Sequence, residues 1–269
     1  MATMAPQGTV GILNPYEGFK HFSLRREPPS DDLAPFVDGF WSVQWDLEGK
    51  PAFEQEVLPY PCVNLSTGVG GFEVHGPATK RIVAQLSGRG SVFGTKLTPA
   101  GFSAFARVPL RELVDAVVTA QVALGRSPRM PPTSDFEAVR AEVEAFLRSF
   151  EPVRTEQMEL ADRLVRLAQE DRAITRAEHL AHAAGTSVRT LHRLFERHVG
   201  VGPKWVVRRS RVQEAAERVA RGEHVDWAGA AHDLGYHDQA HLIRDFRDQI
   251  GLTPAAYARR CHAAVASAR

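Results

Sequence analysis

The chain has 269 residues, of which 43% are hydrophobic and 24% are charged. These are the proportions of an ordinary globular protein, with a length that suggests two domains. No run approaches the roughly 18 apolar residues of a membrane span, and the N-terminus lacks the pattern of a secretory signal. The two cysteines, Cys62 and Cys261, lie far apart without flanking metal ligands. We therefore expect a cytoplasmic protein with no membrane partner, no structural zinc and no cofactor.

Charge is distributed unevenly along the chain, although the formal net charge is only +1. Residues 161–269 hold 18 Lys and Arg against 13 Asp and Glu, whereas residues 1–160 hold 15 against 19. Nine of the 11 histidines also fall in the basic part. A polyanion would bind that part, although an excess of five charges is common on domains that bind no nucleic acid.

The N-terminal part reads as a β-rich domain behind a leader. Residues 1–30 are rich in Gly and Pro with little periodicity, and we interpret them as a leader or arm. Residues 31–124 are assigned to one sensor-like or dimerisation domain, because short apolar or alternating runs predict five or more strands in a mainly β barrel or sandwich. The runs are FVDGFWSVQW, VLPYPCVNL, GFEVHG, KRIVAQL and SVFGTKL, and helical signals follow them.

A linker and a helix are predicted for residues 125–158. Ser134 and Glu137 have the spacing of a capping box. The apolar residues that follow recur at helical spacing: Phe136, Val139, Val143, Phe146, Leu147 and Phe150. Such a stripe is most often core, and a helix that pairs two copies of the chain is the alternative that the sequence leaves open.

An internal repeat with one offset of 51 residues marks the C-terminal part. The matching residues are Leu191, Arg193, Phe195, Gly200 and Pro203 in the first copy and Leu242, Arg244, Phe246, Gly251 and Pro254 in the second. Each copy reads as a short helix, a turn at Gly185 or Gly235, a second helix and a glycine stop. The pattern predicts an all-α domain over residues 159–260, with two helix-turn-helix units and a linker helix from about Lys204 to Arg221, followed by a tail at 261–269.

The second helix of each copy offers candidate DNA contacts on the face opposite its apolar stripe. These are Arg189, His192, Arg193 and Arg197 in the first copy, and Gln239, Ala240, Ile243, Arg244 and Arg247 in the second. Guanidinium groups can grip guanine through two hydrogen bonds, whereas Ala and Ile can touch thymine methyl groups. One such helix alone is readily explained as a solvated basic face. Two helices of the same polarity in one repeat instead favour two recognition helices that bind DNA. Because their exposed residues differ, we expect the two helices to read bases unequally.

Residues from about 160 to 260 resemble the tandem helix-turn-helix domain of AraC/XylS-type regulators. The resemblance is carried by SVRTLHRLFERxVGVGP, by the linker stretch RRSRVQEA, and by LGYHDQAHLIRDFRDQIGLTPAAY. It implies a sequence-specific transcriptional regulator, not an enzyme, whose recognition helices enter successive major grooves of double-stranded DNA. RNA polymerase, a small-molecule effector and a second copy of the chain are partners that it leaves open.

Residues 33–118 also resemble a domain of unknown function that precedes this module in a subset of these regulators. The matching runs are LAPFVxxFW, VLPYPCVNL and FGTKLTPAGF. The resemblance implies a sensor or dimerisation domain and identifies no effector. Five aromatic residues are candidates for an effector pocket, with core packing as the more frequent role: Trp41, Trp45, Tyr60, Phe93 and Phe102.

Rival chemistries have little support in the sequence. His237 and His241 have the spacing of a zinc-protease helix, but no third ligand is evident, and we predict neither a metal site nor a catalytic residue. Cys62 could be a redox sensor or an alkyl acceptor, although a lone cysteine in an apolar run is more often a buried small hydrophobe. An enzyme or DNA-targeted alkyl acceptor that uses the N-terminal domain is therefore the alternative class.

Overall fold

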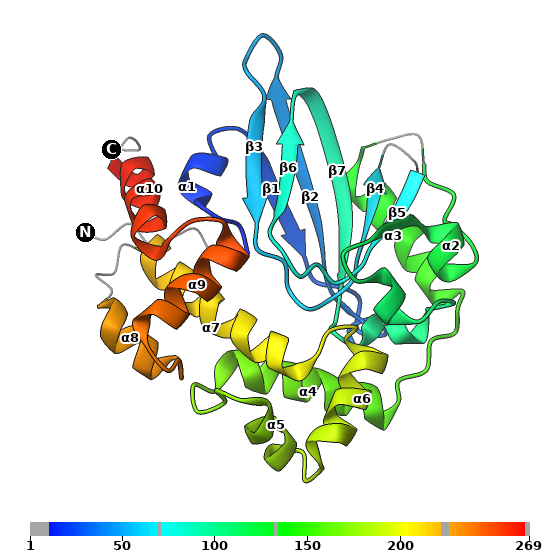
Figure 1. Cartoon of the computed structure of the whole chain (residues 1–269). Helices are drawn as coiled ribbons and strands as arrows, with labels where there is room; N and C mark the ends of the chain where they lie inside the picture. The colour runs from blue at the N-terminus through cyan, green and yellow to red at the C-terminus, as the bar shows by residue number, and fades with distance from the viewer. Residues whose placement is uncertain (1–10, 69–70, 132–133, 222–225, 267–269) are drawn as a thin grey trace.

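The computed structural model describes residues 11–68, 71–131, 134–221 and 226–266 (Figure 1). The strands are β1 (Ser23–Glu27), β2 (Val37–Leu47), β3 (Phe53–Val57), β4 (Asn64–Gly68), β5 (Gly71–His75), β6 (Ile82–Leu86), β7 (Gly88–Leu97) and β8 (Val117–Thr119). The helices of the N-terminal half are α1 (Pro15–Gly18), η1 (Gly101–Ala104), η2 (Leu110–Leu113), α2 (Ala120–Leu124) and α3 (Phe136–Arg148). Those that follow are α4 (Glu156–Glu170), α5 (Ala177–Ala183), α6 (Val188–His198), α7 (Pro203–Ala220), α8 (Trp227–Asp233), α9 (Gln239–Ile250) and α10 (Pro254–Ala266).

The N-terminal half is built on an antiparallel sheet with the strand order β1-β2-β7-β4-β5-β8. Strands β3 and β6 pair with each other in a separate two-stranded ribbon, and Val57 of β3 also forms an antiparallel bridge with Ile12. The longest ladder joins β2 to β7, from the pair Val37 and Leu97 to the pair Leu47 and Gly88. The predicted α+β class is confirmed, with strands in the first half and helices in the second. No helix within the described ranges is long and apolar enough to cross a membrane.

The structure differs from the strand predictions at three places. Residues 23–27, inside the expected leader, form β1 and pair with β2. This strand is stabilised by hydrogen bonds to β2 and has no distinctive alternation in its own sequence. The run VLPYPCVNL is mostly a connection between β3 and β4, since Pro59 and Pro61 have no N–H to donate to a ladder. The short edge strand β8 pairs with β5 and was not predicted.

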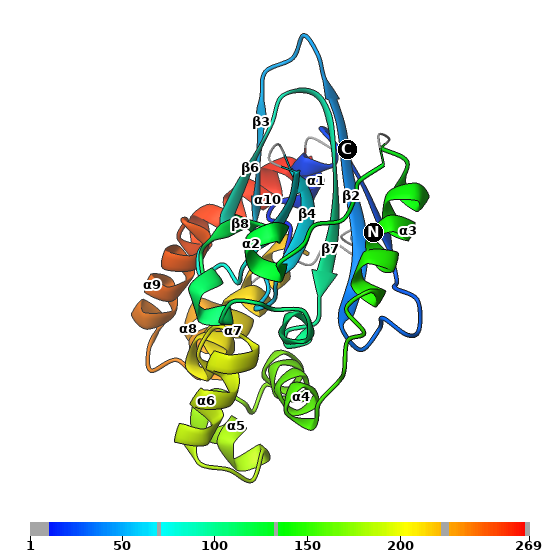
Figure 2. The ribbon, with the colours of Figure 1, turned by 90° about the vertical axis from the view of Figure 1, so that its right-hand side faces the viewer.

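Helix α3 packs against the large sheet and is core. Figure 2 shows α3 on the side of the sheet away from β3 and β6. The ring of Phe136 lies 5.3 Å from that of Phe93 in β7, and the ring of Phe146 lies 6.4 Å from that of Phe72 in β5. The cap is Asp135, which accepts a hydrogen bond from the N–H of Ala138, and not the expected Ser134. The apolar stripe of α3 is therefore buried within the chain.

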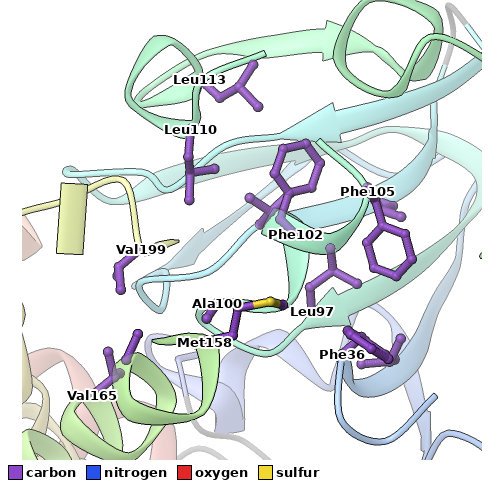
Figure 3. Packing of buried hydrophobic residues seen from close by; sticks show 14 of the residues in the cluster. Phe36, Leu97, Ala100, Phe102, Phe105, Leu110, Leu113, Met158, Val165 and Val199 are labelled. Atoms are coloured by element: carbon purple, nitrogen blue, oxygen red, sulfur yellow. The ribbon is translucent and has the colours of Figure 1, made fainter. Parts of the chain in front are cut away.

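The hydrophobic core runs without a break from the sheet into the first helix-turn-helix unit. Figure 3 shows Met158 and Val165 of α4 and Val199, just after α6, lying toward residues of the N-terminal half. These include Leu97, Ala100, Phe102 and Leu110, all at most 4% exposed. The expected boundary between residues 158 and 159 thus lies within a shared core, and the division into separately folding domains stays a prediction.

The second helix-turn-helix unit has a core of its own. Leu242, Phe246 and Ile250 of α9 are fully buried against α7, α8 and α10. Two residues of the N-terminal half, Leu13 and Leu58, complete this cluster. Burying such apolar side chains stabilises a fold by about 1.5–3 kcal/mol each. The two units therefore have different packing partners, although they arise from one sequence repeat.

Candidate nucleic-acid interface

The predicted first recognition helix is α6, and its local signals are satisfied as expected. The Ser187 hydroxyl accepts a hydrogen bond from the N–H of Thr190 and caps the helix. Gly185 has φ +60° in the turn before it, and Gly200 has φ +81° after its end, so both occupy the left-handed region that glycine tolerates. Leu191 and Phe195 are fully buried. The opposite face of α6 consequently points to solvent.

All four candidate contacts on α6 are exposed: Arg189, His192, Arg193 and Arg197. Within the described residues, no ion pair involves Arg189, Arg193 or Arg197. The nearest acidic residue on the helix, Glu196, has a carboxylate oxygen 3.7 Å from Arg111 of the N-terminal half. These guanidinium groups are therefore available to an anionic partner.

The predicted second recognition helix is α9, and it presents a different surface. Asp238 caps it by accepting a hydrogen bond of 2.7 Å from the N–H of His241, and Gly251 with φ +82° follows its end. Gln239, Ala240, Arg244 and Arg247 are exposed, whereas Ile243 is half-buried. Only part of the Ile243 side chain is open to solvent. Its contact with a thymine methyl group stays a prediction.

Charge also distinguishes the two units. Residues 177–198 contain three arginines and two glutamates, whereas residues 227–250 contain two arginines and four aspartates. One of these aspartates, Asp245, is buried and paired with Arg208 of α7, where the Arg208 Nε–Asp245 Oδ2 distance is 2.7 Å. The second unit is therefore less positively charged than the first.

Buried arginines of α7 join the two units and were missed by the sequence reasoning. Figure 1 shows α7 running between the two units. Arg211, which is 2% exposed, donates hydrogen bonds to the carbonyl oxygens of Ala168 and Asp171 (2.8 Å each) at the end of α4. Arg209, which is 1% exposed, donates to the carbonyl oxygen of Pro59. The only available signal was the run RRSR, which as a charge cluster favours a solvated face.

The five aromatic residues considered for an effector pocket lie in three different surroundings, and their role stays a prediction. Trp41 and Trp45 lie over Gly94 and Gly90, where a Cβ atom would come within 2.1 and 2.3 Å of the indole rings. Phe93 and Phe102 are instead buried in the main core. Tyr60 lies in the β3–β4 connection and accepts a hydrogen bond from Gln213 of α7.

Cys62 and the two candidate zinc histidines lack the surroundings that their rival roles require. Cys62 is 3% exposed, and burial raises the pKa of its thiol to about 11, which keeps the sulfur protonated and a poor nucleophile. His237 is exposed and pairs with Asp238, while the ring of His241 stacks edge-on against Tyr236. No group of three or more potential metal ligands occurs among the described residues.

Comparisons with family models identify two regions of the chain. A model described as a helix-turn-helix domain matches residues 180–260, and a model of a domain of unknown function, DUF6597, matches residues 25–119. The first match contains α6, α7, α8 and α9. The second contains the whole six-stranded sheet except the start of β1, together with the β3–β6 ribbon.

Similarities to individual proteins were also found. The transcriptional activator NphR of Rhodococcus sp. is 32% identical over 114 residues, which are 42% of this chain and 33% of NphR. The C-terminal domain of AraT, a response regulator from Geobacillus stearothermophilus, covers 39% of this chain and 88% of its own at 20% identity, with a TM-score of 0.36. The match to ToxT from Vibrio cholerae covers 89% of this chain and 98% of ToxT at 10% identity, with a TM-score of 0.41. With TM-scores below 0.5, these structures say nothing about the ligands or the oligomeric state of the present chain.

Proposed function

We propose that the protein is a sequence-specific DNA-binding transcriptional regulator. Residues 180–260 match a helix-turn-helix domain and residues 25–119 match DUF6597, and the C-terminal motifs resemble those of AraC/XylS-type regulators. Helices α6 and α9 enter successive major grooves of double-stranded DNA. The protein responds to a small-molecule effector, and it acts without an enzymatic step. Contacts with RNA polymerase and with a second copy of the chain stay predictions from the family resemblance.

The observation that carries the proposal is the two-sided character of α6. Leu191 and Phe195 are fully buried on one side, while Arg189, Arg193 and Arg197 are exposed on the other without an ion-pair partner among the described residues. A guanidinium group that forms no internal ion pair retains its donors for guanine O6 and N7 or for phosphate. The helix is thus held firmly by its apolar face and offers cations to a partner.

Unequal reading by the two helices follows from their different faces. Arg193 on α6 is exposed, whereas the corresponding contact region of α9 combines Ala240, Ile243 and Arg244. We expect α6 to discriminate guanine and α9 to favour thymine more weakly.

Selection of double-stranded DNA from a random library with the full chain tests the proposal. Binding of the recovered site is then measured by fluorescence anisotropy at several salt concentrations. We expect a strong salt dependence, because Lys and Arg release counterions when they neutralise phosphates. Arg193→Ala should weaken binding by about 5- to 150-fold, or about 1–3 kcal/mol, with the loss concentrated at one G·C pair.

Arg89→Ala provides a matched control, because Arg89 is also exposed but pairs with Asp46 and Glu48 at the end of the β2–β7 ladder. It should leave DNA affinity unchanged, and Ile243→Ala should cost less than Arg193→Ala. Failure to enrich any sequence, or an affinity independent of salt, would overturn the proposal. If Arg193→Ala weakens all sequences equally, the side chain contacts phosphate and the assignment of base reading to it is wrong.

A further inference from the structure

A cleft of about 830 Å³ lies where the N-terminal half meets the end of α6. One wall comes from η1, η2 and the segment between them, and the other comes from residues 151–158 and from the last two residues of α6. The volume is that of a typical small-molecule site. None of the residues proposed earlier for an effector pocket lines it.

The lining of the cleft is half apolar and half polar. Ala104, Val108, Leu110 and Met158 contribute apolar surface. Among the polar lining residues, Nδ1 of His198 lies 3.0 Å from the Ser103 hydroxyl and Nε2 lies 3.4 Å from the Gln157 amide oxygen. This combination suits an amphipathic ligand, whose apolar body contacts these four apolar residues while a polar group exchanges hydrogen bonds with Ser103 or Gln157.

Charge at the cleft limits the chemistry of the occupant further. Its lining contains the carboxylates of Glu151 and Glu156 and the guanidinium of Arg197. Burial lowers the pKa of His198, so the imidazole is neutral at physiological pH and adds no positive charge. The lining therefore has an excess of negative charge, which disfavours a carboxylate or phosphate ligand.

The cleft is coupled directly to the recognition helix. His198 is the last residue of α6, and Arg197 beside it is one of the candidate DNA contacts. Just beyond, a Cβ atom on Gly200 would lie 2.9 Å from Cγ of Leu110, so α6 ends in close contact with η2. A ligand in the cleft would therefore contact the end of α6 directly.

We propose that this cleft binds a small amphipathic effector without negative charge, and that its occupancy changes DNA binding through α6. The inference rests on the proposed function for its DNA readout, while ligand binding itself can be measured without DNA. The apolar residues, the hydrogen-bonding groups and the net negative charge of the lining define the ligand class, and the contact with the end of α6 defines the route of regulation.

A pair of related fluorescent probes tests the ligand class with the full chain. N-phenyl-1-naphthylamine is uncharged, and 1-anilinonaphthalene-8-sulfonate has the same aromatic body with a negative charge. We expect the uncharged probe to bind at least tenfold more tightly. Ala104→Trp should fill the cleft and abolish this binding, whereas Ala52→Trp, at an exposed position outside the cleft lining, should not. Equal affinity for both probes, or binding that survives Ala104→Trp, overturns the proposed ligand site.

A tethered occupant tests the regulatory step without an identified effector. Both native cysteines are at most 3% exposed, so an introduced surface cysteine can be labelled selectively. Val153 lines the cleft and is 73% exposed, whereas Val122 on α2 is 56% exposed and does not line it. Each Val→Cys variant is labelled with benzyl methanethiosulfonate, which attaches an uncharged benzyl group through a disulfide.

Labelling of Val153→Cys should change affinity for the selected DNA at least fivefold, and labelling of Val122→Cys should not. If both labelled variants bind like the unlabelled chain, occupancy of the cleft does not regulate DNA binding and the inference is overturned. If the unlabelled chain selects no DNA at all, the proposed function fails instead, and the probe titrations still decide whether the cleft binds a ligand.

Discussion

Substitution of Arg209 tests how α7 is joined to the β3–β4 connection and to α9. The Arg209 guanidinium donates hydrogen bonds of 3.0 and 2.8 Å to the carbonyl oxygen of Pro59 and one of 3.2 Å to the side chain of Gln249. It therefore joins α7 both to the β3–β4 connection and to α9. We expect Arg209→Lys, the change that keeps the charge, to destabilise the protein more than Arg209→Met, which removes it.

Two opposing energies determine this order. Burial lowers the pKa of Arg209 from 12.5 to about 9, which at about 1.4 kcal/mol per pKa unit places the cost of burying the charge near 5 kcal/mol. Three hydrogen bonds from a charged donor contribute about 1.5–3 kcal/mol each and offset that cost. Methionine removes both contributions but leaves the Pro59 carbonyl unpaired, so it should destabilise by about 1–3 kcal/mol.

Lysine retains a buried charge and loses the planar fork that reaches both partners. It forfeits at least two of the three hydrogen bonds and should destabilise by about 3–6 kcal/mol. Urea unfolding of the full chain measures the free energy of each variant, with Arg163→Lys, at an exposed position of α4, as the control expected to change it by less than about 0.5 kcal/mol. The reasoning is refuted if Arg209→Lys is as stable as the parent chain or more stable than Arg209→Met.

Further predictions concern pH, backbone strain and the separate core of the second unit. Burial lowers the pKa of His198, so its contribution to stability is complete above about pH 6.5 and is lost as pH falls through the folded-state pKa. The difference in free energy of unfolding between the parent and His198→Gln should therefore shrink in acid. Gly200→Ala should cost more than Gly185→Ala, because both have positive φ but only Gly200 has a close neighbour, Leu110; equal melting temperatures would contradict this. Leu242→Ala should cost about 2.7–5 kcal/mol and accelerate hydrogen exchange in α8–α10 before it does so in the sheet, whereas uniform acceleration would show one cooperative unit.

Much of the helical half could be predicted because its signals are local. Ser187 and Asp238 cap helices through hydrogen bonds that span three residues. Gly200 and Gly251 end them in the left-handed conformation. Apolar residues at helical spacing then specify which face of α6 and α9 is buried, and thereby which side chains remain for DNA.

The sheet was predicted less completely because edge strands depend on their neighbours. β1 and β8 have no distinctive alternation and are stabilised by pairing with β2 and β5. The connection after β3 contains Pro59 and Pro61 within an apolar run, and that run resembles a strand until the missing N–H donors are considered.

The sequence by itself determined the two helix-turn-helix units, their exposed cations and the α+β class. Only the tertiary structure decided that the first unit shares the core of the sheet, that Arg209 and Arg211 are buried, and that a cleft opens beside His198. These features depend on contacts between distant segments, such as that between Arg209 and Pro59, which lie 150 residues apart. A local pattern contains the periodicity and caps of a helix, but it does not contain the surface against which that helix will pack.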